Sequence, residues 1–190
     1  TFLIFFISIY IFAKKEVNYF SNENWFYTLG NAFIPSIIAF GLGFLVTFGF
    51  IFIIEILPVS QNIKEWITIP NQGYIEIFEQ IKNKNHFFII LWIFYIVFLA
   101  PLTEEILFRG ALQKFVGRVI KFKNFDCIIT ALIFSMFHIN SLSNAVFSFI
   151  VGYILSRERK ITGKINTSIW IHSIINFIGL FYGIIFEYKR

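Results

Sequence analysis

Charged residues are scarce in this sequence. They make up 14% of the 190 residues, whereas hydrophobic residues make up 57% and the mean hydropathy is +0.74. Ordinary soluble proteins carry roughly 25% charged residues. A chain of this length has too little interior to bury so much apolar surface, so the composition excludes an ordinary soluble domain and indicates a lipid bilayer as the solvent.

Cysteine is nearly absent as well. The single cysteine, Cys127, excludes an internal disulfide framework and a Cys-rich metal site, and its apolar neighbours favour a small buried side chain. The net charge of +5 is not concentrated in a tract, because the basic residues lie between apolar segments, as membrane topology determinants do. We therefore expect membrane lipid as a partner and no nucleic acid.

The apolar residues form about six segments, given that a helix needs roughly 20 residues to cross a bilayer. We predict an all-α, polytopic transmembrane helical bundle in two regions, with N-terminal helices and an extracytoplasmic loop over residues 1–86 and a catalytic core over residues 87–187. The expected spans are Thr1–Ala13 (the tail of a truncated span), Asn31–Leu57, Phe87–Leu112, a pair of short helices at Phe125–Phe137 and Leu142–Leu155, and Asn166–Phe186.

The distribution of basic residues predicts the orientation. If every segment crosses once, three basic linkers fall on one side, and the charge-balanced loop Pro58–His86 falls on the other. Basic loops face the cytoplasm. We therefore expect an integral protein of a bacterial plasma membrane whose site opens toward the cytoplasm, with Trp66, Tyr74 and Phe78 of the outer loop at the interface. The linkers contain Lys14, Lys15, Lys114, Arg118, Lys121, Lys123, Arg157, Arg159, Lys160 and Lys164.

Ionisable side chains inside a span are costly, so each one is a candidate functional residue. Glu105 and Arg109 are four residues apart on one helix face, in the favourable order for an ion pair. Glu104 points about 100° away from Glu105 on the same helix. The spacing predicts that Arg109 neutralises one carboxylate and leaves Glu104 available as a general base. Glu55 lies near the end of its span and is interpreted as structural.

Two further helices carry imidazoles. His138 ends an apolar helix, where a lone histidine is usually a capping or interfacial residue. His172 and Asn176 share one helix face, which indicates either an interhelical hydrogen bond or a site. We count the depth of each residue from the expected cytoplasmic end of its helix, at 1.5 Å per residue. Glu104 and His172 then lie at similar depths in the membrane, and His138 lies deeper by a couple of helical turns.

These segments resemble, in this order, the signature of the CAAX protease and bacteriocin-processing family, also called CAAX prenyl protease 2 or lysostaphin-resistance-A-like (Abi) proteins. The pattern is Glu-Glu-x-x-x-Arg, Phe-x-x-x-His and His-x-x-x-Asn on successive helices. Every position is present: Glu104, Glu105 and Arg109, then Phe134 and His138, then His172 and Asn176.

The resemblance implies an intramembrane endopeptidase acting on a peptide or protein. It implies that Glu104 activates water with His138, and that His172 and Asn176 bind the oxyanion. It also implies that Glu105 and Arg109 orient their helix. This interpretation requires no cofactor, and the implied roles extend to peptide or bacteriocin processing and self-immunity.

Three alternatives remain open. The acid and two imidazoles also suit zinc, although a His-Glu-x-x-His helix is absent and Asn176 would have no role. A non-catalytic immunity factor or scaffold would need none of these residues for chemistry. A transporter is least favoured, because the sequence shows no inverted repeat.

Overall fold

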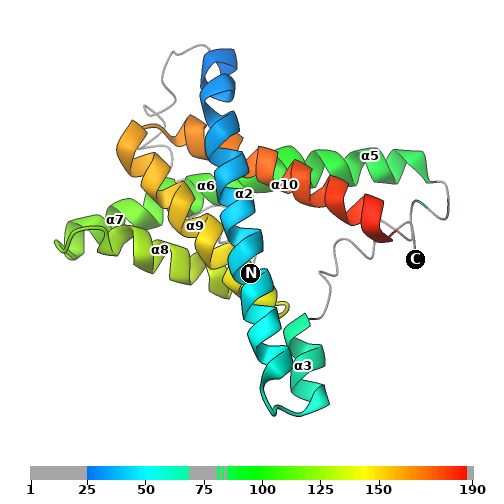
Figure 1. Cartoon of the computed structure of the whole chain (residues 1–190). Coiled ribbons are helices and arrows are strands. Elements are labelled where there is room, and N and C mark those ends of the chain that lie inside the picture. Colours follow the sequence, from blue (N-terminus) through cyan, green and yellow to red (C-terminus); the bar gives the residue numbers. More distant parts are fainter. Residues whose placement is uncertain (1–24, 69–80, 82, 84, 188–190) are drawn as a thin grey trace, which may run out of the picture.

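The computed structural model describes residues 25–68, 81, 83 and 85–187, and its elements there are all helices (Figure 1). The all-α prediction is therefore confirmed. The separate helices are α2 (Trp25–Ile56), α3 (Gln61–Thr68), α8 (Phe125–Met136), α9 (Leu142–Thr162) and α10 (Ile165–Glu187).

One long helix is built from five consecutive segments of differing pitch. These are α5 (His86–Phe94), η2 (Tyr95–Leu99), α6 (Ala100–Glu105), η3 (Ile106–Leu112) and α7 (Gln113–Val119), of which η2 and η3 are π-helical. A π-helical turn is wider than an α-helical turn and changes the direction of the side chains that follow it. The two candidate acids lie in the short α-helical segment between the π-helical turns.

Several predicted boundaries differ from the structure. The helix of the two acids continues seven residues beyond the expected end at Leu112, and α9 continues to Thr162. The second helix of the predicted short pair, Leu142–Leu155, is therefore longer than predicted, since α9 is 21 residues long. The C-terminal turns of α9 are basic and hydrophilic. The prediction ended the helix before them because it followed only the apolar run. The predicted span at residues 1–13, Tyr74 and Phe78 lie outside the described residues.

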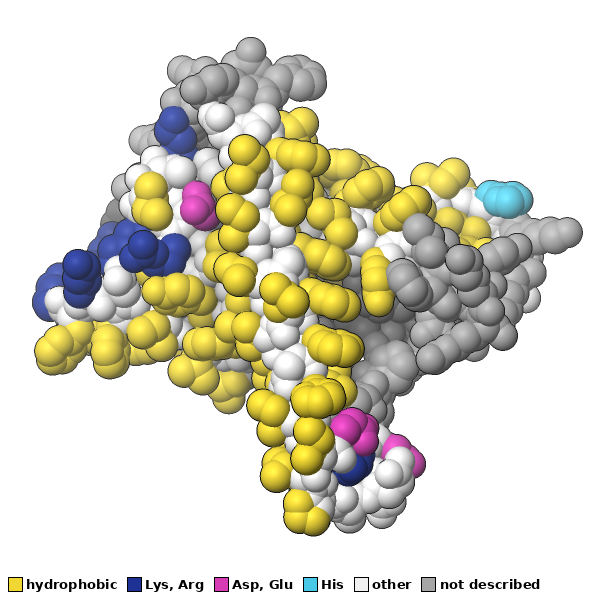
Figure 2. Space-filling view, viewed as in Figure 1, with side chains coloured by type: hydrophobic (Ala, Val, Ile, Leu, Met, Phe, Trp, Pro, Cys, Tyr) yellow, Lys and Arg dark blue, Asp and Glu magenta, His cyan; other side chains and the backbone are white. Residues whose placement is uncertain are grey.

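Within the described part of the chain, two helices are long and apolar enough to cross a membrane, namely Thr28–Ile56 and His86–Val119. Only 11% of the apolar window of each helix is buried inside the protein. Figure 2 shows apolar side chains along the exposed face of α2. Helices that carry so many exposed apolar side chains agree with a bundle that lies in lipid rather than in water.

The core forms where α2, α9 and α10 meet. Small side chains such as Ala32 and Ala39 let α2 approach its neighbours closely, and Ser36 donates a hydrogen bond at 2.6 Å to the Ala32 carbonyl. Small residues at helix contacts are typical of membrane bundles. The buried members of this cluster are Ala32, Ala39, Val151, Leu155, Ile171 and Ile175. This packing fixes α10, which carries His172 and Asn176, against α9.

The first turns of α3 are tied to the end of α2 by an ion pair. Lys64 Nζ lies 3.3 Å from the Glu55 carboxylate and donates to the Glu55 carbonyl at 2.7 Å. Ile67 of α3 is buried, whereas Ile63 and Trp66 are exposed. The structural interpretation of Glu55 agrees with this contact.

Candidate active site

Three helices bring one acid and two imidazoles together. Glu104 comes from α6, His172 from α10, and His138 from the turn that follows α8. The Glu104 Oε2 atom lies 3.7 Å from Nε2 of His138 and 3.9 Å from Nε2 of His172. Among the described residues this oxygen is buried and has no hydrogen-bond partner. The sequence-predicted convergence of these three side chains is therefore observed.

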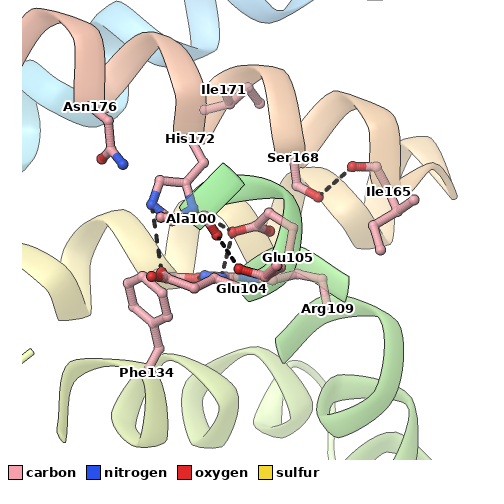
Figure 3. A network of polar contacts seen from close by, with 12 residues as sticks. Ala100, Glu104, Glu105, Arg109, Phe134, Ile165, Ser168, Ile171, His172 and Asn176 are labelled. Carbon is pink, nitrogen blue, oxygen red and sulfur yellow. Dashed lines mark hydrogen bonds and ion pairs between the residues drawn. The ribbon is translucent and has the colours of Figure 1, made fainter. Parts of the chain in front are cut away.

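Glu105 lies next to Glu104 in sequence but in a different environment. Its side chain is 0% exposed, compared with 29% for that of Glu104. Glu105 Oε1 accepts hydrogen bonds from Arg109 Nη1 at 2.7 Å and from His172 Nδ1 at 2.8 Å. The predicted Glu105–Arg109 ion pair is confirmed, and the contact with His172 adds a partner that the spacing alone did not reveal (Figure 3).

Arg109 is completely buried and reaches α9 as well as Glu105. Its Nη2 donates to the Gly152 carbonyl at 2.9 Å, and its guanidinium lies over the Phe134 ring, 4.6 Å from the ring centroid. A Cβ on Gly152 would lie 3.4 Å from Nη2 and 3.0 Å from Phe134 Cδ1. Gly152 therefore gives the guanidinium the space to reach α9, and no sequence signal had pointed to this residue.

Asn176 is held by a carbonyl of the π-helical turn η2. Its Nδ2 donates to the Ile96 carbonyl at 2.9 Å. In η2 the Ala100 N–H bonds to the Tyr95 carbonyl, five residues earlier. The next donor in that pattern would be residue 101, a proline without an N–H, so the side chain of Asn176 serves the Ile96 carbonyl instead. A carboxamide has two N–H groups, and one of them remains for another acceptor.

The orientation of His138 is set by the backbone around it. Its Nδ1 lies 2.9 Å from the Phe134 carbonyl, and Asn144 Nδ2 donates to the His138 carbonyl at 2.7 Å. The Phe134 ring lies 4.4 Å from the His138 ring and 5.8 Å from the His172 ring, between centroids. The phenylalanine of the Phe-x-x-x-His motif thus packs against both imidazoles.

The expected difference in depth between His138 and Glu104 disappears with the observed helix ends. Measured from Val119, the true end of its helix, Glu104 lies about 22 Å deep at 1.5 Å per residue. His138 lies about 20 Å from the start of α8 by the same measure. This difference arose because the predicted end at Leu112 was seven residues too early. His172, however, lies only about 10 Å from the start of α10 by the same measure, so depth counted from helix ends does not by itself predict that the three side chains meet.

Metal binding was the main alternative for these side chains. Within the described ranges, no group of three or more His, Cys, Asp or Glu side chains is arranged to hold a metal ion. Ligand atoms around tetrahedral zinc lie about 3.4 Å apart. The Glu104 oxygen is somewhat farther than that from both imidazole nitrogens.

The fold and the site define a class of protein: a helical protein with lipid-type apolar surfaces and a partly buried acid–imidazole centre between its helices. A family model described as "Type II CAAX prenyl endopeptidase Rce1-like" matches residues 86–178. Residues 86–178, which contain all the candidate site residues, are therefore similar to the CAAX prenyl endopeptidase family.

This match confirms the resemblance drawn from the three motifs and indicates a protease. The family and the exposed apolar helices both agree with an integral membrane protein. No curated protein and no solved structure matches the chain.

Proposed function

We propose that the chain is an intramembrane endopeptidase in which Glu104 activates the water molecule that attacks a peptide bond. The observation that supports this role most directly is the buried Glu104 Oε2, which has no hydrogen-bond partner in the described part of the chain and faces both imidazoles. The neighbouring acid also has a buried oxygen without a partner in the described part of the chain, Glu105 Oε2, but its other oxygen, Oε1, is engaged with Arg109 and His172. Glu104 is therefore the carboxylate that is available to accept a proton.

The proposed reaction needs no serine or cysteine nucleophile. Glu104 takes one proton from a water molecule that His138 also orients, and the water oxygen forms a bond to the carbonyl carbon. The π electrons of the carbonyl move to its oxygen, which His172 and Asn176 stabilise as an oxyanion. When the intermediate collapses, the C–N bond breaks and the leaving amine takes the proton from Glu104.

The proposed substrate is a peptide or protein segment that reaches the site from the cytoplasmic side of a bacterial plasma membrane. The charge pattern supports this orientation, because the exposed residues Arg118, Lys121 and Lys123 lie at the corner between α7 and α8. The name of the family gives a prenylated CAAX segment as one candidate. Peptide or bacteriocin processing and self-immunity are the biological roles that we propose.

Glu104→Gln tests the proposal. The protein in lipid nanodiscs is incubated with prenylated CAAX peptides, their unprenylated counterparts and a fluorogenic peptide library, and products are identified by mass spectrometry. We expect Glu104→Gln to lower turnover by roughly 10²–10⁴-fold, the usual contribution of a general base.

Glu55→Gln is the matched control, since Glu55 is bound to Lys64 and lies outside the site. It should retain the wild-type rate. Undiminished cleavage by a folded Glu104→Gln protein would remove the glutamate mechanism. A binding-only immunity protein would keep its protective effect in cells after this substitution.

A further inference from the structure

We propose that the corner between α7 and α8 is a docking surface for anionic phospholipid headgroups, and that aromatic side chains at this corner insert beside the headgroups into the same leaflet. The corner comprises residues 114–125, which include most of α7 and the turn that leads into α8. It contains none of the candidate site residues, so the proposal is independent of the proposed protease function.

Lysine and arginine side chains are concentrated at this end of the molecule. In the described part of the chain, every Lys and Arg except Lys64 and Arg109 lies between residues 114 and 123 or between residues 157 and 164. Both exceptions are ion-paired with a glutamate. Figure 2 shows the basic side chains gathered along one edge of the molecule. The positive charge of the described residues is therefore concentrated at this edge.

The corner itself contains only basic charges. Its basic residues are Lys114, Arg118, Lys121 and Lys123, and it has no Asp or Glu. The next acid in the sequence, Asp126, is buried, and its Oδ1 atom accepts a hydrogen bond from Lys160 Nζ at 2.7 Å. Asp126 is thus already compensated from α9. Because Lys121 and Lys123 are exposed, the corner presents a net positive charge to its surroundings.

Exposed aromatic rings lie beside these lysines. Phe122, which stands between Lys121 and Lys123 in the sequence, is 74% exposed. Its ring packs against that of Phe125, which is also exposed, with 5.7 Å between the ring centroids. Two exposed rings gain free energy when they leave water for an apolar phase. Acyl chains next to the headgroups provide such a phase.

The α7 helix continues the same arrangement. Phe115 and Val119 are exposed and four residues apart, so they share one helix face. Lys114 and Arg118 have the same spacing and lie about 100° around the helix axis from that face. Neighbouring apolar and basic faces are typical of helical segments in a membrane interface, where the apolar face contacts acyl chains and the basic face attracts anionic lipid.

The length of the spanning helix places the corner at the membrane surface. The helix His86–Val119 has 34 residues and is long and apolar enough to cross a membrane. At 1.5 Å per residue it extends about 50 Å, whereas the hydrocarbon core of a bilayer is about 30 Å thick. A single crossing therefore leaves the end of α7 in the headgroup layer, where phosphate groups can accept from the lysines.

Charge decides which lipids this surface favours. Phosphatidylglycerol carries a net negative charge and phosphatidylcholine carries none. One lysine or arginine near an anionic membrane surface strengthens the attraction by about fivefold. Anionic lipids should therefore be enriched around the corner, and an apolar surface without cations should show no such preference.

Fluorescence quenching by brominated lipids tests the proposal. The full chain with Phe122→Trp is placed in phosphatidylcholine nanodiscs in which a small fraction of the lipid has brominated acyl chains and either a glycerol or a choline headgroup. The signal of the four native tryptophans, measured on the wild-type protein, is subtracted. We expect brominated phosphatidylglycerol to quench the introduced tryptophan about fivefold more than brominated phosphatidylcholine. The ratio should approach one in molar salt, where the Debye length is about 3 Å.

Matched variants separate charge from simple lipid contact. Leu45→Trp, at a 67% exposed position on the apolar helix α2, should be quenched equally by the two lipids. Adding Lys121→Gln and Lys123→Gln to Phe122→Trp should lower the quenching ratio toward one. Adding Lys64→Gln instead should leave the ratio unchanged, because the charge of this lysine is compensated by Glu55. Circular dichroism establishes that each variant is folded.

Three results would overturn the proposal. The first is equal quenching of Phe122→Trp by the two lipids, and the second is a ratio that the two lysine substitutions do not change. The third is an introduced tryptophan that aqueous acrylamide quenches and neither lipid does, which would mean that the corner faces water and serves a soluble partner. None of these measurements needs a peptide substrate, so failure of the proposed function would appear only in the Glu104→Gln assay.

Discussion

At the scale of single residues, two adjacent carboxylates have different chemical environments. Helix geometry separates their directions, and this was predictable from the Glu-Glu-x-x-x-Arg spacing. Glu105 is fully buried between Arg109 and His172, whereas Glu104 keeps a buried oxygen that faces two imidazoles. Among the described residues, Glu105 thus accepts two hydrogen bonds through Oε1, whereas the buried Oε2 atoms of both acids have no hydrogen-bond partner, and of these we propose that of Glu104 for the chemistry.

Glu104 Oε2 and the Nε2 atoms of His138 and His172 would also attract a cation. Metal dependence therefore needs a direct experiment. We expect peptide cleavage to survive exhaustive dialysis against a strong chelator, because in the proposed mechanism a carboxylate base and hydrogen-bond donors to the oxyanion supply the chemistry without a metal. The rate is measured before and after dialysis, with metal content determined by mass spectrometry. Loss of activity that zinc restores would establish a metalloprotease in place of the glutamate mechanism.

At the scale of elements, an irregularity in the helix of residues 86–119 connects it to α10. Pro101 cannot donate to the Ile96 carbonyl, and Asn176 of α10 donates to it instead. A proline within an apolar helix therefore connects the π-helical turn η2 to the site. This connection was not predicted, because spacing along one helix does not show which carbonyl a residue of another helix reaches.

Pro101→Ala tests this connection by restoring a backbone N–H near the Ile96 carbonyl. The added donor competes with Asn176, and since a hydrogen bond contributes about 0.5–1.5 kcal/mol, we expect cleavage to fall by up to roughly tenfold. The measurement is a double-mutant cycle with Asn176→Ala. Pro101→Ala should have no further effect on the rate when Asn176 is already absent, and additive effects would contradict the coupling.

Close packing between α8 and α9 depends on Gly152. A methyl group there would meet Phe134 Cδ1 at 3.0 Å, Ala131 Cα at 3.4 Å and Arg109 Nη2 at 3.4 Å. We expect Gly152→Ala to destabilise the protein by about 1–3 kcal/mol, the typical cost of overpacking, and to lower activity through Arg109.

Thermal unfolding in detergent measures this effect. Gly49→Ala on α2 is the matched control, because its added methyl group would have nothing within 4 Å. The control should be neutral or slightly stabilising. Equal stability of the two variants would show that α8 and α9 can separate without cost.

At the scale of the whole molecule, the charge distribution predicts the orientation in the membrane. Lys123 lies at the exposed corner between α7 and α8, and Gln61 lies at the exposed start of α3, on the opposite side of the predicted topology. Figure 2 shows basic side chains gathered at one edge of the molecule.

Single cysteines at these two positions test the orientation with a membrane-impermeant maleimide. The native Cys127 is 0% exposed, so the background labelling should be low. In intact cells we expect Gln61→Cys to react and Lys123→Cys to react only after the membrane is opened. The reverse pattern would invert the topology and place the entry to the site outside the cytoplasm.

The sequence alone was sufficient for the helical class, it agreed with a membrane environment, and it supplied the candidate site residues. Long apolar runs with few ionisable groups indicate helices that lie in a bilayer. The i, i+4 spacings place Glu105 with Arg109, and His172 with Asn176, on common helix faces. The approach of Glu104, His138 and His172 was predicted from the motifs, although not its geometry.

Tertiary structure alone decided which atoms meet. The bond from His172 to Glu105, the Ile96 carbonyl that holds Asn176, and the space that Gly152 leaves for Arg109 each join residues on different helices. Local spacing specifies directions around one helix axis, but the relative rotation and depth of two helices depend on packing along their whole length. For this reason the sequence determined the side chains available for chemistry, and the packing determined their partners.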